Sequence, residues 1–88
     1  MGTISIRYWA SARSAAGMDA ETLAIDAPIT LSEVLRRLGE EHPESRLLAV
    51  LDACSVLLGD RPVSTEDPDD VLVAAGDTLE FLPPFAGG

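Results

Sequence analysis

The chain has 88 residues and a mass of 9.3 kDa, which is the size of one domain and leaves no room for a linker. With 47% apolar and 24% charged residues, neither a disordered tail nor a membrane-spanning chain is expected. Fifteen acidic against six basic residues give a net charge of −9, which disfavours nucleic acids and anionic membranes and favours a partner protein with a basic face.

Two strands are predicted at the beginning of the chain. Apolar and polar residues alternate over residues 3–9 and again over residues 21–27, as in half-buried strands. Residues 10–20 between them are small and polar, with Gly17 in their second half, and are expected to form a connection. The two strands are therefore expected to pair as a hairpin.

A helix is predicted from residue 31. Thr30 and Glu33 have the spacing of a capping box, in which the threonine hydroxyl accepts an early helix N–H and Glu33 reaches back to the cap. The helix is expected to end at His42-Pro43, because proline disfavours helical backbone in the residue before it. Apolar residues at helical spacing form one face: Leu31, Val34, Leu35 and Leu38.

A short hairpin is predicted in the second half. Residues 45–53 before it fit either one or two helical turns or an irregular segment. Residues 55–58 and 61–63 are expected to form two strands joined by a turn in which Gly59 supplies a positive φ. Because Pro62 cannot donate to a β-ladder, the returning strand is expected at an edge of the sheet.

The last part of the folded region is predicted to hold an acidic loop at residues 64–70, a turn or short strand at 71–75 and a final strand at 78–82. Two strands, a helix, a hairpin and a last strand predict an α+β fold in which the helix crosses one face of a mixed sheet. A fold of this size offers no obvious catalytic cleft.

The final six residues are predicted to form a tail that leaves a domain of residues 1–82. Two prolines favour an extended path, and six residues reach at most about 20 Å, enough to enter a pocket of another protein. Phe85 is able to anchor the docked tail, while glycine without Cβ passes a narrow channel and leaves its carbonyl open to attack. The ionised carboxylate of Gly88 is able to attack the α-phosphate of ATP, giving an acyl-adenylate that a sulfur nucleophile captures.

These features resemble the MoaD/ThiS family of sulfur carriers, whose fold is the ubiquitin-like β-grasp. The resemblance extends over essentially the whole chain, although residues 44–54 have no clear counterpart and Leu58-Gly59-Asp60 replaces a turn that relatives often build differently. It is carried by residues 6–10, Ala16-Gly17, residues 30–38, Gly76-Asp77 and, most specifically, residues 81–88.

The resemblance implies that an adenylating enzyme of the ubiquitin-activating type uses ATP and magnesium to charge Gly88, which sulfur converts to a thiocarboxylate. The tail then enters the large subunit of molybdopterin synthase, and two carriers of a heterotetramer supply two sulfurs to the cyclic pyranopterin precursor. On this interpretation the chain binds no cofactor or metal and is not an enzyme on its own, because the catalytic pocket belongs to the large subunit. The implied docking residues are Pro83, Pro84, Phe85, Ala86 and Gly87.

Three alternatives remain open on the sequence. Sulfur carriage for thiamin or cysteine biosynthesis keeps the chemistry and changes the acceptor. Attachment of Gly88 to target lysines would make the chain a protein modifier, although it has no lysine on which to build chains of itself. A plain interaction module with an inert tail is the third.

Cys54, the only cysteine, excludes an internal disulfide and a thiolate metal cluster and is expected to be a buried small hydrophobe rather than a persulfide carrier. An N-terminus without the pattern of a signal peptide adds to the expectation of a reducing, cytoplasmic location.

Other residues with reactive side chains are expected to be structural. His42 is expected to cap its helix or to be solvated, since no second metal ligand stands at a suitable spacing. The aspartates at 67, 69 and 70 are expected to form a solvated loop, because the glycine and distant glutamate of a calcium loop are missing. Tyr8 and Trp9 point to opposite faces of their strand, so at most one is expected in the core, and a partner surface is expected for the other.

Overall fold

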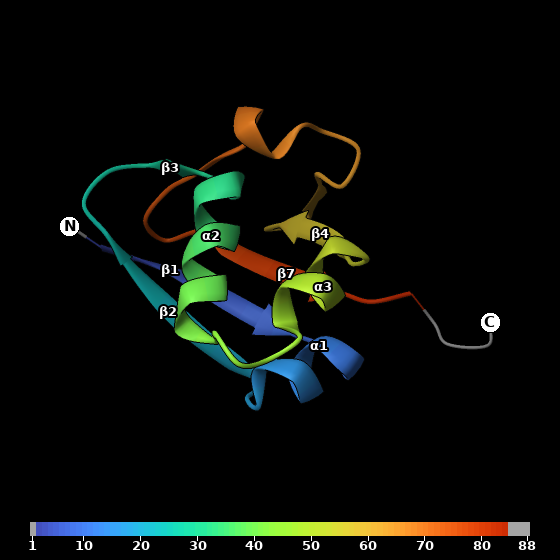
Figure 1. Cartoon of the computed structure of the whole chain (residues 1–88). Coiled ribbons are helices and arrows are strands. Elements are labelled where there is room, and N and C mark those ends of the chain that lie inside the picture. Colours follow the sequence, from blue (N-terminus) through green and yellow to red (C-terminus); the bar gives the residue numbers. More distant parts are fainter. Residues whose placement is uncertain (1, 85–88) are drawn as a thin grey trace.

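The computed structural model describes residues 2–84. Its architecture is α+β, as predicted, with helices packed on a mixed sheet (Figure 1). In chain order the elements are β1 (Gly2–Tyr8), α1 (Ala10–Ala16), β2 (Ala20–Ile25), β3 (Ile29–Thr30), α2 (Leu31–Glu41), α3 (Leu47–Asp52), β4 (Ser55–Leu58), β5 (Arg61–Pro62), the 3-10 helix η1 (Pro68–Asp70), β6 (Leu72–Val73) and β7 (Thr78–Leu82).

The main sheet has five strands in the order β2-β1-β7-β4-β5. β1 and β7 are parallel, and the other neighbours are antiparallel. The predicted pairing of the first two strands is confirmed, as is the edge position of the strand that contains Pro62. The last strand along the chain, β7, therefore occupies the centre of the sheet, and the tail starts from there.

The helix α1 corrects the prediction of a connection over residues 10–20. Only Ala12 and Ala16 of this helix are buried, so its apolar face consists of small side chains and gives little periodic signal. The helix ends at Gly17, whose φ of 75° is the left-handed conformation that glycine adopts without strain.

The predicted helix is α2, and half of its capping box is confirmed. The Thr30 hydroxyl accepts the Glu33 N–H at 3.1 Å. The Glu33 carboxylate, which was expected to bond back to the cap, instead accepts from Arg36 at 2.9 Å and Arg37 at 3.2 Å. The two arginines lie one helical turn after Glu33, and they bind its carboxylate in place of the backbone N–H of the cap residue. Leu35 is half-buried rather than part of the fully buried face.

The remaining segments settle the open alternatives. Residues 45–53 contain α3, and Gly59 has the predicted positive φ of 63°. Residues 71–75 contain β6, which pairs with β3 in a separate two-stranded sheet that the sequence did not predict. The predicted acidic loop includes the single turn η1.

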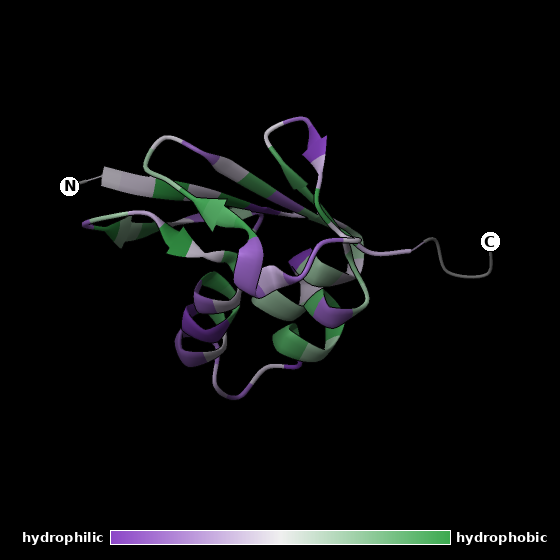
Figure 2. Cartoon of the chain, turned by 90° about the horizontal axis from the view of Figure 1, so that it is seen from above, coloured by the Kyte–Doolittle hydropathy of each residue, from purple (hydrophilic) through white to green (hydrophobic). Residues whose placement is uncertain are grey.

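The helices cover one face of the main sheet and leave the other face open (Figure 2). The core lies between the sheet and the helices, and Val34, Leu38 and Leu47 from the helices meet Ile4, Ile6, Leu79 and Phe81 from the strands, each 0% exposed. None of the helices within residues 2–84 is long and apolar enough to cross a membrane.

Candidate functional site

The described chain leaves the sheet at one end of its central strand. Leu82 is the last residue of β7, where it pairs with Ser55 of β4, and half-buried Pro83 and exposed Pro84 follow. Proline has no N–H to donate, so the ladder cannot continue along the next two residues. Because β1 runs parallel to β7, the end of β1 lies beside this exit point.

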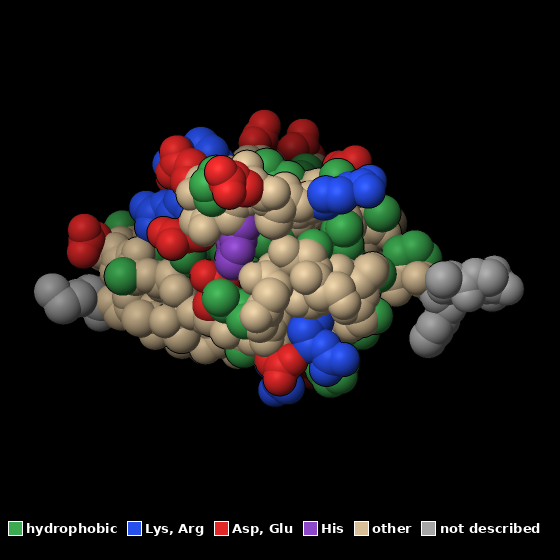
Figure 3. All heavy atoms as spheres, turned by 60° about the horizontal axis from the view of Figure 1, so that its bottom comes forward, with side chains coloured by type: hydrophobic (Ala, Val, Ile, Leu, Met, Phe, Trp, Pro, Cys, Tyr) green, Lys and Arg blue, Asp and Glu red, His purple; other side chains and the backbone are tan. Residues whose placement is uncertain are grey.

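A groove surrounds the exit point and is called the tail-root groove below. It has a volume of about 730 Å³ and gathers residues from the end of β1, the start of α1, β4 and the end of β7. None of its lining side chains is charged, although the chain carries a net charge of −9. Figure 3 shows hydrophobic side chains beside the C-terminal end of the described chain. The lining residues are Trp9, Ala10, Ser11, Ser55, Leu57, Leu82, Pro83 and Pro84.

Trp9 is the largest side chain of the tail-root groove and is 44% exposed. Its backbone N–H donates to the Phe81 carbonyl at 3.2 Å, which ties the residue to β7. Its indole Nε1 donates to Glu80 Oε1 at 3.0 Å, and the Arg7 guanidinium carbon lies 5.5 Å from the ring centroid. The predicted division is thus confirmed: Tyr8 is 3% exposed in the core, and Trp9 is on the surface.

The predicted tail is described only in part. Pro83 and Pro84 line the tail-root groove, while Phe85, Ala86, Gly87 and Gly88 lie outside the described residues. Sequence reasoning missed Leu57 and Leu82 as surface residues of the site. Their alternation with buried neighbours is visible in the sequence, but their proximity depends on the pairing of β4 with β7.

Cys54 is buried, as predicted. Its Sγ lies 3.3 Å from the Val50 carbonyl, and burial raises the pKa of the thiol. A raised pKa reduces the fraction of nucleophilic thiolate. The geometry therefore gives no support to Cys54 as a sulfur carrier.

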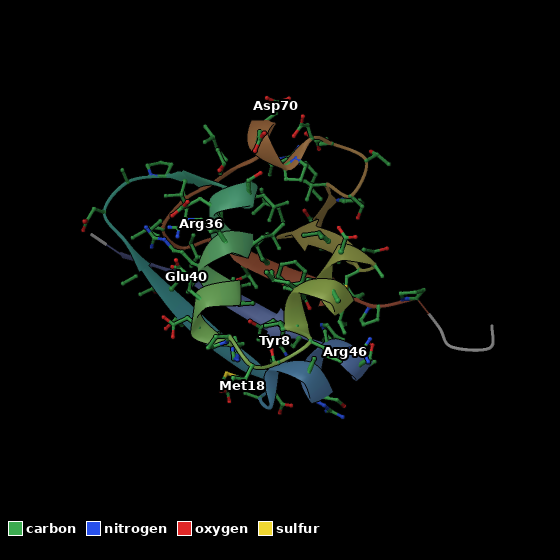
Figure 4. The ribbon with its side chains drawn as sticks, viewed as in Figure 1. Tyr8, Met18, Arg36, Glu40, Arg46 and Asp70 are labelled. Atoms are coloured by element: carbon green, nitrogen blue, oxygen red, sulfur yellow. The ribbon has the colours of Figure 1, made fainter. Side chains whose placement is uncertain are left out.

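His42 is the C-cap residue of α2, which confirms one of its two predicted roles. Its side chain is not solvated: it is 11% exposed, and Nε2 lies 2.7 Å from Glu21 Oε2. The same carboxylate oxygen accepts the Tyr8 hydroxyl at 2.6 Å. Figure 4 shows Tyr8 on the helix-covered side of the sheet, away from the tail. The three residues join the sheet to the end of α2.

Two of the three aspartates in the loop after β5 have side-chain hydrogen-bond partners. Asp67 Oδ1 accepts the Asp69 N–H at 2.9 Å and caps η1, and the Asp69 carboxylate accepts the Ser32 hydroxyl. All three aspartates of this loop are exposed. Among residues 2–84 there is no group of three His, Cys, Asp or Glu side chains that could hold a metal ion.

The site as described offers a surface for docking rather than a set of reacting groups. Among the described residues that line the tail-root groove, the polar side-chain groups are the hydroxyls of Ser11 and Ser55 and the indole N–H of Trp9. Within residues 2–84, no acid, base or activated nucleophile lines it.

Comparison with known proteins supplies the context of this geometry. A sequence model of the ThiS family matches residues 6–88. A protein of Aspergillus niger named molybdopterin synthase sulfur carrier subunit is 34% identical, over 98% of this chain and 94% of its own length.

Two solved structures share the fold. The crystal structure of SAMP1 from Haloferax volcanii superposes with a TM-score of 0.79 at 24% identity, covering 99% of this chain and 100% of that one. A protein–protein complex of subunits 1 and 2 of molybdopterin-converting factor from Helicobacter pylori contains a chain with a TM-score of 0.65 at 21% identity, covering 98% and 99%. At these identities the two likenesses concern the architecture.

Proposed function

From the premise that the chain belongs to the ThiS family, we propose that it is the sulfur carrier subunit of a molybdopterin synthase. The observation that carries this proposal is the 34% identity, over nearly the full length of both chains, to a protein of that name. The fold is the ubiquitin-like β-grasp expected from the sequence resemblance. An uncharged groove at the root of the tail supports the assignment, because a carrier must dock before its tip reacts.

Gly88, the last residue of the sequence, is the proposed carrier of sulfur. Its carboxylate oxygen attacks the α-phosphorus of ATP bound to an adenylating enzyme, and pyrophosphate leaves. A hydrosulfide ion then attacks the acyl carbon and displaces AMP, and loss of its proton leaves a thiocarboxylate on Gly88. ATP is a substrate of the adenylating enzyme, so the proposal requires no resident cofactor in this chain.

The proposed partners bind at the tail-root groove. Residues 85–88 span at most about 14 Å beyond Pro84, so a protein that holds Gly88 in its catalytic pocket must also cover the surface around Pro84. That surface is the groove containing Trp9, Leu57 and Leu82. The large synthase subunit is the proposed acceptor, and the adenylating enzyme is the proposed partner in the charging step.

The uncharged lining of the groove supports a proposed division of roles between this chain and its partners. We assign residues 1–82 to the docking domain and residues 83–88 to the carrier tail, and we assign the acid and base groups to the partners. The free thiol of Cys54 fits a reducing compartment, and on this basis we place the reaction in the cytoplasm.

Intact-mass analysis tests the carrier chemistry directly. The full chain is incubated with an adenylating enzyme of proven activity, ATP, magnesium and a sulfide donor. The expected product is heavier by the difference between one sulfur and one oxygen. A chain lacking Gly87 and Gly88 is the matched control and is expected to fold normally and remain uncharged. An unchanged mass of the full chain would contradict the proposal.

The choice of acceptor is tested in a second step. The charged chain is mixed with the large synthase subunit and the pyranopterin precursor, and conversion of the precursor is the expected result. Consumption of the thiocarboxylate only by a thiamin or cysteine biosynthetic acceptor would move the chain to that pathway. Covalent conjugates to lysines of other proteins in a lysate would instead support a protein modifier.

A further inference from the structure

We propose that Glu80 is a positioning residue that holds the indole of Trp9 in its docking orientation. The inference rests on the proposed function, because it concerns the surface that meets the partner. It adds a polar side chain to a site whose lining is uncharged. Glu80 acts through Trp9 and does not itself line the tail-root groove.

The sheet register places Glu80 between the two strands, β1 and β4, that contribute to the tail-root groove. Glu80 lies on the central strand β7 and is the register partner of Arg7 on β1 and of Leu57 on β4. Its neighbours along the strand, Leu79 and Phe81, are both 0% exposed, so the alternation of β7 turns Glu80 to the open face. From this position its carboxylate reaches the indole N–H of Trp9 at 3.0 Å.

The indole is held from two directions. Glu80 accepts its N–H at the edge of the ring, and the guanidinium of Arg7 lies over the ring at 5.5 Å from the centroid. A cation over the ring face and an acceptor at the N–H are compatible only with a narrow range of side-chain orientations. The backbone of Trp9 is already fixed through Phe81, so only the side-chain rotation remains to be restrained.

Restraint before binding is useful at this site. Trp9 is 44% exposed, and a free indole would lose rotational freedom when a partner covers it. Because the hydrogen bond to Glu80 already restricts the indole in the free chain, less rotational freedom is lost when the partner binds. It stabilises the fold little, because both of its partners contact water. The expected consequence is a change in docking with a nearly unchanged fold.

The variants Glu80→Ala and Glu80→Gln separate positioning from charge. Glutamine keeps an oxygen that accepts the indole N–H and removes the charge, whereas alanine removes both. With the adenylating enzyme that charges the wild-type chain, E80A is expected to raise KM for the carrier about three- to tenfold and to leave kcat within about twofold. E80Q is expected to stay within about twofold of wild type in both. Equal losses in the two variants would overturn the proposal in favour of a direct charge contact with the partner.

A double-mutant cycle with Trp9→Phe tests whether Glu80 acts through the indole. Phenylalanine keeps the aromatic ring and lacks the N–H, so adding E80A to W9F is expected to change KM by less than about twofold. A full E80A effect in the W9F background would contradict positioning through the hydrogen bond.

Fluorescence gives a readout that needs no enzyme. Trp9 is the only tryptophan, so its steady-state anisotropy reports the mobility of this one indole. E80A is expected to lower the anisotropy and to increase acrylamide quenching, and E80Q to change neither. Unchanged values in E80A would refute the proposal even if the chain is charged. Conversely, a wild-type chain that cannot be charged would refute the proposed function and leave this test standing.

Discussion

Tyr8 and Trp9 are neighbours in sequence that face opposite sides of the sheet, and each donates a side-chain hydrogen bond to a glutamate. The Tyr8 hydroxyl donates to Glu21 at 2.6 Å, and the Trp9 indole donates to Glu80 at 3.0 Å. Tyr8 is 3% exposed and Trp9 is 44% exposed. The same kind of bond therefore occurs once where water is largely excluded and once where water competes.

The helix-side cluster consists of Tyr8, Glu21 and His42. One carboxylate oxygen lies 2.6 Å from the Tyr8 hydroxyl and 2.7 Å from His42 Nε2, and the two rings meet edge to face at 6.4 Å. Tyr8 also stacks on Phe81 at a centroid distance of 6.2 Å. Removing one member leaves a shielded polar group without its partner, which is costly.

The open-face cluster consists of Trp9, Glu80 and Arg7. Water replaces a lost hydrogen bond there, so the bond contributes orientation rather than much stability. Because water competes only weakly at the buried pair, that pair supports the fold, whereas the exposed pair mainly orients a surface side chain.

Alanine at the two neighbouring positions gives the largest expected contrast. Tyr8→Ala is expected to lower the free energy of unfolding by about 3–5 kcal/mol, because it opens a cavity beside Phe81 and removes a buried hydrogen bond. Trp9→Ala is expected to lower it by about 1 kcal/mol or less, since its ring is partly in water. Urea unfolding followed by circular dichroism measures both. Equal losses would contradict the division between the clusters.

The two glutamates give the next contrast. Glu21→Leu removes the acceptor of Tyr8 and His42 together and is expected to cost about 2–4 kcal/mol of unfolding free energy. Glu80→Leu is the matched change on the open face and is expected to cost less than about 0.5 kcal/mol. The midpoints of urea unfolding provide the comparison. A larger loss for Glu80→Leu than for Glu21→Leu would reverse the assignment of the clusters.

The sequence predicts the long elements of the fold better than it predicts the site. The helix after Thr30 and the strands beside it follow from caps and periodicity, because each repeats a signal over many residues. The helix α1 was missed because alanines at 12 and 16 are its only buried residues. The two-residue strand β3 was missed, and β6 was predicted only as one of two alternatives, because two residues carry no period.

The residues that form the site come together only in the folded chain, so their proximity could not be predicted from the sequence. The sequence predicts Pro83 and Pro84 as docking residues, and it limits Trp9 to either the core or a partner surface. The contact of Trp9 with Glu80, 71 positions away in sequence, exists because β1 and β7 pair in parallel. The alternation within each strand predicts the face of the sheet on which each side chain lies, but it does not predict that Trp9 and Glu80 are neighbours.

Alkaline pH is expected to weaken the helix-side cluster alone. Burial first, and then the hydrogen bond and charge of Glu21, raise the pKa of Tyr8 well above its ordinary value. The unfolded tyrosine ionises near pH 10 while the folded one keeps its proton, so this stability is complete below about pH 10 and is lost above it. The expected slope approaches about 1.4 kcal/mol per pH unit.

Few side chains of this protein titrate at alkaline pH, so the contribution of Tyr8 can be measured separately. The chain has no lysine, and Tyr8 is its only tyrosine, so Cys54 is the other side chain that titrates in this range. Burial also raises the pKa of Cys54, which gives a loss of the same sign at lower pH. Urea unfolding between pH 9 and 11 in a Cys54→Ala background therefore isolates Tyr8, and adding Tyr8→Phe is expected to flatten the profile. A slope that survives Tyr8→Phe would exclude Tyr8 as its source.

A small effect on stability is expected directly after Trp9, where the chain enters α1. Ala10 directly follows Trp9, begins α1 and has a φ of 50°, in the left-handed region that costs a residue with Cβ about 1–2 kcal/mol. Ala10→Gly is therefore expected to raise the free energy of unfolding by up to about 1 kcal/mol after the added entropy of the unfolded chain is subtracted.

Gly17→Ala at the other end of the same helix is the matched reverse change. Gly17 has a φ of 75°, and an added Cβ would meet nothing within 4 Å, so only backbone strain opposes the substitution. A loss of about 1 kcal/mol is expected there. Glycine can keep the same turn at position 10, so the anisotropy of Trp9 should not change in Ala10→Gly. A fall in that anisotropy would mean that the strained turn, together with Glu80, holds the indole in place.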